Sequence, residues 1–130
     1  MPWNDLTQNP RVILAYYSTP PELDAVEVHS LLLHRDGGPT IEVVVELPVF
    51  PDRPSPRWEA SANAVQARFR FFGLRDIRIE GWDATNIGRL AVSPAREGVR
   101  FDFRGGHASC VGVSDWFDIA EIIAYTKKTA

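Results

Sequence analysis

The chain is most informative between residues 64 and 82, where it reads Ala64-Val-Gln-Ala-Arg-Phe-Arg-Phe-Phe-Gly-Leu-Arg-Asp-Ile-Arg-Ile-Glu-Gly-Trp82. Apolar and charged residues alternate through two runs, and Gly73 separates them. Because successive side chains of a strand point to opposite faces, the pattern predicts two strands that pair as an antiparallel hairpin. The expected dry face holds Val65, Ala67, Phe69, Phe71, Ile77 and Ile79, and the expected wet face holds Arg68, Arg70, Arg78 and Glu80.

Further strands are predicted on both sides of this stretch. Upstream, the runs from Ala25 to His34 and from Thr40 to Leu47 flank a tight glycine turn. Downstream, three more runs are strand candidates: Asn86 to Val92, Val99 to Arg104 and His107 to Val113. Of these, Val99 to Arg104 repeats the alternation of apolar and charged residues. In the run that begins at Ala25, we expect Val26, Val28 and Leu32 on one face and Leu31 and Leu33 on the other.

Two segments predict other structures. Asn9 suits an N-cap and Pro10 a first helical position, so a short helix is expected there, ended by Pro20 and Pro21. Pro48 to Asn63 has no periodicity and predicts a loop of about fifteen residues, held down by Trp58.

The last segment fits either a helix or a strand. Ser114 suits an N-cap, whereas the alternation of Ile119, Glu121 and Ile123 suits a strand. We favour a short helix or turn at 114–117 that leads into a strand. If the segment were helical, Asp115, Asp118 and Glu121 would form an acidic stripe.

These patterns predict an α+β fold that is predominantly β. We expect a single domain over residues 1–130, with an antiparallel meander of about seven to eight strands and a short N-terminal helix. The meander would form a curled sheet or an open barrel. Hydrophobic residues make up 45% and charged residues 24% of the 130 residues, as in chains that fold on their own.

Charge and hydropathy restrict the functional classes. Fourteen basic and seventeen acidic residues give a net charge of -3, which offers no positive field for nucleic acid or anionic lipid. Neither a membrane span nor a signal peptide is evident, so we expect a cytoplasmic protein. The lone Cys110 is expected to be reduced and buried as a small hydrophobe.

No set of residues predicts catalysis, a cofactor or a metal. His107 and Cys110 are three apart, and on one strand they would face opposite sides. His29 and His34 are five apart and have the same problem, and one cysteine with three histidines does not supply a structural zinc site. The glycine pairs 37–38 and 105–106 open no helix, so no phosphate loop is predicted.

Tryptophans beside acidic residues predict a protein-binding surface. Tryptophan is a preferred anchor in interfaces, and flanking carboxylates suit a basic partner. For Trp116, burial in the core is the alternative. The predicted partner-binding residues are Trp58, Trp82, Asp83, Asp115, Trp116 and Asp118.

The order and spacing of several short motifs resemble the immunity protein 50 family, predicted antidotes in bacterial polymorphic toxin systems. The motifs cover nearly the whole chain: Trp3 with Asn9-Pro10, the run from Pro21 to Gly37, Pro54-Ser-Pro-Arg-Trp58, Asn63-Ala-Val-Gln66 and Ile79-Glu-Gly-Trp82. The resemblance implies a non-catalytic protein that binds and neutralises a cognate toxin. The acidic balance of the chain would suit a basic, nuclease-like toxin.

Two other functions are kept as alternatives. An enzyme would need a pocket in which His107 or His29 meets Asp83 or Asp115. A small-ligand barrel would need an unfilled interior, lined by Phe69, Phe71, Phe101 and Phe103.

Overall fold

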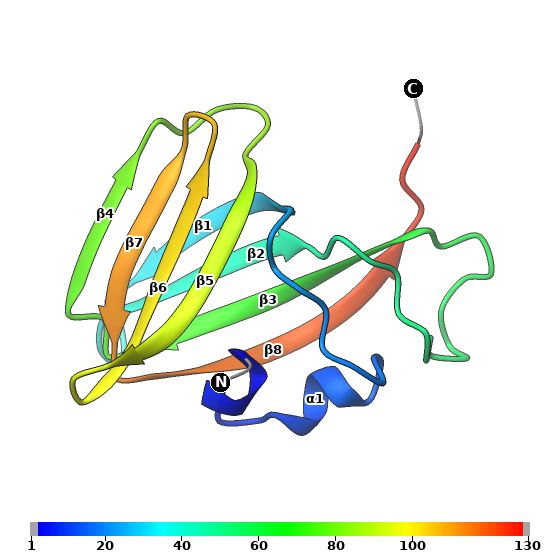
Figure 1. Ribbon diagram of the computed structural model, residues 1–130, viewed down its shortest axis with the longest axis horizontal. Helices are drawn as coiled ribbons and strands as arrows, with labels where there is room; N and C mark the ends of the chain where they lie inside the picture. The colour runs from blue at the N-terminus through cyan, green and yellow to red at the C-terminus, as the bar shows by residue number, and fades with distance from the viewer. Residues whose placement is uncertain (1–2, 129–130) are drawn as a thin grey trace.

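The computed structural model describes residues 3–128, which form eight strands in one antiparallel sheet (Figure 1). Its order is β4-β7-β6-β5-β1-β2-β3-β8. The predicted β-rich, curled sheet is confirmed, and the sheet does not close into a barrel. The strands are β1 (Val26–His34), β2 (Thr40–Glu46), β3 (Ala64–Phe72), β4 (Asp76–Glu80), β5 (Ile87–Ala95), β6 (Gly98–Gly105), β7 (Ser109–Ser114) and β8 (Trp116–Tyr125).

The sheet bends into two halves that face each other across the core (Figure 1). We call β1, β2, β3 and β8 the first half-sheet, and β4, β7, β6 and β5 the second half-sheet. They are joined where β1 meets β5, through the pairs Val26 with Gly88 and Glu27 with Ile87. Beyond these pairs the two strands diverge, so the sheet opens there.

The predicted hairpin between residues 64 and 82 is wrong. β3 pairs with β2 and β8, whereas β4 pairs with β7 at an edge of the sheet. The chain passes from one half-sheet to the other at Gly73, where φ is +65°. A side chain there would collide with Asp115, so a turn that only glycine adopts readily sends β4 away from β3.

Aromatic rings from both half-sheets form the core. The ring of Phe71 lies 4.2 Å from that of Phe101 and 5.1 Å from that of Phe117. Phe69 stacks on Phe117 at 6.1 Å and contacts the indole of Trp3 at 5.5 Å. The predicted dry face of β3 is therefore confirmed, since Val65, Ala67, Phe69 and Phe71 are all buried.

A β-bulge changes the faces of β1. The register with β2 shifts between Val28 and Ser30, so one extra residue, His29, is inserted. As a result Leu31 and Leu33 join Val28 on the inner face, and Leu32 turns outward opposite Glu42. The expected grouping of Leu32 with the valines is wrong because a bulge breaks the period of two.

The N-terminal segment forms a 3-10 turn, η1 (Trp3–Leu6), and a short helix, α1 (Arg11–Leu14). It lies against both half-sheets, since η1 contacts β5 and the Gln8 N–H bonds the Phe117 carbonyl of β8. The predicted helix exists, but Pro10 holds the N-cap position and Asn9 does not cap it. Instead, the Asn9 side chain donates to the Ile119 carbonyl at 2.9 Å and accepts the Ile119 N–H at 3.0 Å. The Asn9 side chain therefore bonds the backbone of β8 as a neighbouring strand would.

The last segment is a strand, and the predicted helix or turn at 114–117 is wrong for Ser114, which ends β7, and for Trp116 and Phe117, which begin β8. Only Asp115 lies in a bend between the two strands. A register shift in β8 pairs Arg68 with Glu121 but Phe69 with Ile119. This bulge puts Asp118 and Glu121, three apart, on the same outer face. Of the helical segments within residues 3–128, none has the length and apolar content needed to cross a membrane.

Candidate protein-binding surfaces

An aromatic and charged cluster lies on the outer face of the first half-sheet. Trp116 at the start of β8 stacks on Phe72 of β3, with ring centroids 4.2 Å apart. The Arg70 guanidinium lies 5.1 Å from the Phe72 ring and donates two hydrogen bonds to Asp118, at 2.8 and 2.6 Å. We call these four residues the Trp116 cluster. Cross-strand pairing of β3 with β8 aligns them, since Phe72 faces Trp116 and Arg70 faces Asp118.

The Trp116 cluster has the chemistry of an interface anchor. The Trp116 side chain remains 39% exposed although its ring is held by stacking. Because the ring is already ordered, little further conformational entropy is lost when a partner binds it. The hydrogen bonds from Arg70 to Asp118 raise the pKa of the Arg70 guanidinium and hold its side chain in place. A rigid, half-exposed tryptophan beside an arginine is typical of binding hot spots.

Around this cluster the outer face of the first half-sheet carries more acids than bases. The acids are Glu27, Glu42, Glu46, Asp118 and Glu121, and the bases are Arg68, Arg70 and Lys127. Ion pairs link most of them, with Arg68 contacting both Glu42 and Glu121. The excess of carboxylates complements a basic surface better than an acidic one.

A second polar group on this face contains metal-type ligands that the sequence did not single out. Ligand atoms of Glu27, His29 and Glu46 lie within 4.8 Å of one another, because the bulge turns His29 toward the cross-strand pair of glutamates. Both Glu46 oxygens already accept hydrogen bonds, one from the Tyr125 hydroxyl and one from Lys127 at 3.0 Å. An ammonium group thus already neutralises this carboxylate.

Burial and hydrogen bonding act in opposite directions on this group. Burial favours the neutral form of Glu46, but the bonds from Tyr125 and Lys127 outweigh it and hold the Glu46 pKa below its usual value. Burial and the same carboxylate raise the pKa of Tyr125. The arrangement is a satisfied network that ties the C-terminal end of the chain to the sheet.

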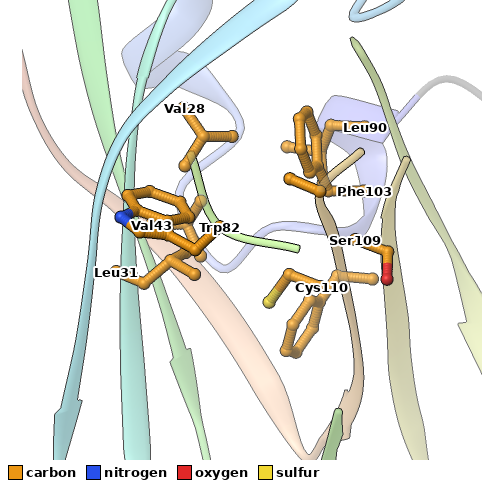
Figure 2. A pocket seen from close by; sticks show the side chains of 10 residues that line it. Val28, Leu31, Val43, Trp82, Leu90, Phe103, Ser109 and Cys110 are labelled. Atoms are coloured by element: carbon orange, nitrogen blue, oxygen red, sulfur yellow. The ribbon is translucent and has the colours of Figure 1, made fainter. Parts of the chain in front are cut away.

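Trp82 and Asp83 lie elsewhere, in the loop after β4. The Trp82 side chain is 49% exposed, and part of it closes a small cavity between the two half-sheets (Figure 2). The Asp83 carboxylate accepts the N–H of Ala84, and its backbone bonds Asn86. These bonds stiffen the loop that presents Trp82.

The structure distributes the predicted residues over three places. Trp116 and Asp118 belong to one cluster, and Asp115 lies next to them at the corner, paired with Arg75 at 3.2 Å. Trp82 and Asp83 form the second place. Trp58, the third, is half-buried and stacks on Tyr16 at 5.0 Å, which confirms that it holds down the proline loop.

The pairs required by the enzyme alternative do not form among residues 3–128. His29 contacts Gln66 and Glu46, and Asp115 contacts Arg75. His107 is exposed in the turn between β6 and β7, whereas Cys110 is buried as predicted. Burial raises the Cys110 pKa to about 11, so the thiol stays protonated at neutral pH and is a poor nucleophile.

The small-ligand alternative is contradicted by the packing of the interior. Phe69, Phe71, Phe101 and Phe103 are each 2% exposed or less and fill the space between the half-sheets. The cavity in Figure 2 measures about 10 Å³, which is room for one water molecule at most. Its walls are Val28, Leu31, Val43, Trp82, Leu90, Phe101, Phe103, Ala108, Ser109 and Cys110.

Comparison with protein families places the chain in a known family. The chain belongs to the immunity protein 50 family, whose model matches residues 9–125 of the 130. The match includes all eight strands of the described region and the predicted partner-binding residues. Comparisons with curated proteins and with solved structures return no match.

Proposed function

We propose that this protein binds a cognate bacterial toxin domain and neutralises it by forming a stoichiometric complex, without catalysis. The family match over residues 9–125 carries the proposal. The packed interior and the protonated, buried Cys110 support a role in binding rather than turnover. Such a protein would act in the bacterial cytoplasm, before the toxin reaches its target.

The Trp116 cluster is the surface that we assign to the toxin. It offers a large aromatic ring, a fixed arginine and a surrounding excess of carboxylates on the outer face. Acidic surroundings would attract a basic toxin and speed its association. A nuclease domain, which must itself bind phosphates through cationic residues, has this complementary charge.

The test begins with the gene adjacent to that of this protein, which we expect to encode the toxin domain. Co-expression with this protein should restore bacterial growth, and the two should co-purify at a fixed ratio. Isothermal titration calorimetry should then give roughly ten- to hundredfold weaker binding for Trp116→Ala, the loss expected for a hot-spot residue. Leu14→Ala is a matched control, since Leu14 is similarly exposed on α1.

Each part of the proposal can fail separately. If the wild-type protein does not restore growth, the proposed immunity function is wrong. If the wild-type protein restores growth but Trp116→Ala and Trp82→Ala both bind the toxin with unchanged affinity, the function stands and the interface lies elsewhere. If the association rate does not change with salt concentration, the proposal that the toxin is basic is wrong, because attraction between exposed charges weakens as ionic strength rises.

A further inference from the structure

Three strand edges of the described sheet are open to different degrees. A fourth, that of β5 beyond Gly88, is interrupted by Pro94 and by the bond from the Leu90 N–H to the Leu23 carbonyl at 2.8 Å. β4 carries charges at three of its five positions, Asp76, Arg78 and Glu80, which discourage another strand from pairing. The start of β8 is covered, because the N–H of Gln8 donates to the Phe117 carbonyl at 2.9 Å and Asn9 bonds Ile119. The third edge, that of β1, lacks both kinds of protection.

This third edge arises where β1 separates from β5. The last backbone bond between them runs from the Val28 N–H to the Asn86 carbonyl, at 2.8 Å. Within residues 3–128, the segment 29–34 has a strand partner on its β2 side alone. Its sequence, His29-Ser-Leu-Leu-Leu-His34, contains no Asp, Glu, Lys, Arg or Pro. Natural sheets rarely leave such an edge exposed.

The register shows which backbone groups are free. The Leu47 N–H bonds Val65, so alternation along β2 turns the odd-numbered residues toward β3 and the even-numbered ones toward β1. Leu31 and Leu33 lie opposite the odd-numbered Val43 and Ile41. Their N–H and C=O groups therefore point to the open side, where a new strand could pair with them.

An apolar groove lies beside these groups. It has a volume of about 470 Å³ and is lined by His29, Ser30, Leu31, Leu33, Ile79 and Trp82. Leu33 is 52% exposed although it projects from the inner face of the sheet, where its neighbour Ile41 is fully buried. The inner face is thus apolar and uncovered at this one end of β1.

We infer that the open edge of β1 accepts an extended strand of the toxin, in an inference that rests on the function proposed above. The added strand pairs with the backbone of Leu31 and Leu33. Its alternate side chains are apolar and enter the groove against Leu33, Ile79 and Trp82. Peptides that extend a sheet in this manner gain affinity from main-chain bonds and specificity from the pockets beside them.

Continuity with the Trp116 cluster favours the toxin as the occupant. One row of paired residues crosses the first half-sheet from His34 through Thr40 and Phe72 to Trp116. Four strands at a spacing of about 4.8 Å put the β1 edge roughly 15 Å from Trp116. A strand added at the β1 edge turns its other alternate side chains to the outer face, in line with this row, so one partner can cover both sites.

A second copy of this chain fits the edge less well. Antiparallel pairing of two such edges would join six residues of each copy, positions 29–34. Stable interfaces use about 20–30 residues on each side. A toxin that also covers the Trp116 cluster reaches that size.

The test uses a proline substitution at the edge. Leu33→Pro removes the N–H that faces the open side and leaves the bonds to β2 in place, since proline is tolerated on strand edges. Leu33→Ala keeps that N–H but removes the side chain from the groove. Leu14→Ala is the control, because Leu14 is 36% exposed on α1, outside both the β1 edge and the Trp116 cluster.

Affinity for the toxin domain encoded by the adjacent gene is measured by calorimetry, after circular dichroism shows that each variant is folded. We expect binding weaker by at least about tenfold for Leu33→Pro, and by about three- to tenfold for Leu33→Ala. Leu14→Ala should stay within about threefold of wild type. Hydrogen exchange in the wild-type complex should show new protection at the amides of Leu31 and Leu33.

Contrary outcomes separate this inference from the proposed function. If wild-type protein binds the toxin, but Leu33→Ala binds equally well and the two amides gain no protection, strand addition is wrong and the immunity function stands. If the free protein is a dimer in light scattering and Leu33→Pro makes it monomeric, the occupant is a second copy. If wild-type protein does not bind the toxin at all, both proposals fall.

Discussion

β3 and β4 have the same alternation of apolar and charged residues but opposite positions in the fold. β3 lies between β2 and β8, and its inward side chains are fully enclosed. β4 is an edge strand, and Ile79 on its inner side is 37% exposed. A period of two therefore shows which side chains share a face, whereas the number of strand partners determines how deeply that face is buried.

The largest expected difference between the two strands comes from their inward side chains. Phe71→Ala should lower the free energy of unfolding by about 3–5 kcal/mol, because Phe71 joins the rings of both half-sheets. Ile79→Ala should cost less than about 1.5 kcal/mol. Urea denaturation of both variants measures this. Equal losses would contradict the assignment of β4 as a lightly buried edge.

The second expected effect concerns β8, which pairs with β3 and so makes β3 an interior strand. Asn9→Ala should cost about 1–3 kcal/mol, because it leaves the backbone groups of Ile119 without partners. Hydrogen exchange should show faster exchange at Ile119 than at residues of β7. Asn9→Asp, which keeps the acceptor and loses the donor, should be intermediate. Unchanged exchange at Ile119 would mean that water replaces Asn9.

A smaller effect distinguishes the outward side chains of the two strands. Arg70 donates two bonds to Asp118, whereas Arg78 is mostly exposed and lies 4.0 Å from Glu80. Arg70→Lys should cost about 0.5–1 kcal/mol after solvent screening, since lysine does not reproduce the two parallel bonds. Arg78→Lys should be neutral in thermal denaturation. A neutral Arg70→Lys would show that the pair adds rigidity without stability.

The smallest effect depends on pH. The pKa of Glu46 is lower in the folded protein than in the unfolded chain, so its contribution is present above the unfolded value and is lost as pH falls through the folded value. Glu46→Gln should therefore cost about 1 kcal/mol or less at pH 7 and nothing near pH 2. Urea titrations at the two pH values measure this. A constant difference would mean that the hydrogen bond from Tyr125, rather than the charge, matters.

Much of the fold could be predicted from alternation alone. The inner face of β3, seven of the strand segments and the role of Trp58 all follow from residue type and spacing. The partner of each strand could not be predicted, because alternation carries no information about which strand lies alongside. The hairpin prediction failed at Gly73 for this reason, since a glycine suits both a hairpin turn and a passage between half-sheets.

The candidate surfaces were predicted less completely. Tryptophans beside acids indicated Trp116 and Trp82, but Phe72 and Arg70, which hold Trp116 in place, come from a strand more than forty residues away. The bulges at His29 and near Ala120 move side chains between faces, and no local sequence pattern predicts them. The open edge of β1 depends on where β5 diverges, which is a property of the whole sheet.

The attachment of Asn9 to Ile119 also affects how the chain folds during synthesis. The two residues are 110 positions apart, so the first segment made must wait for the last strand before it can be fixed in place. Until β8 emerges from the ribosome, the outer edge of β3 is open as well. Contacts between distant parts of a chain slow folding, and strand edges left open during that time favour aggregation. Newly made chains should therefore depend on β8 for solubility, and truncation before Trp116 should yield insoluble protein.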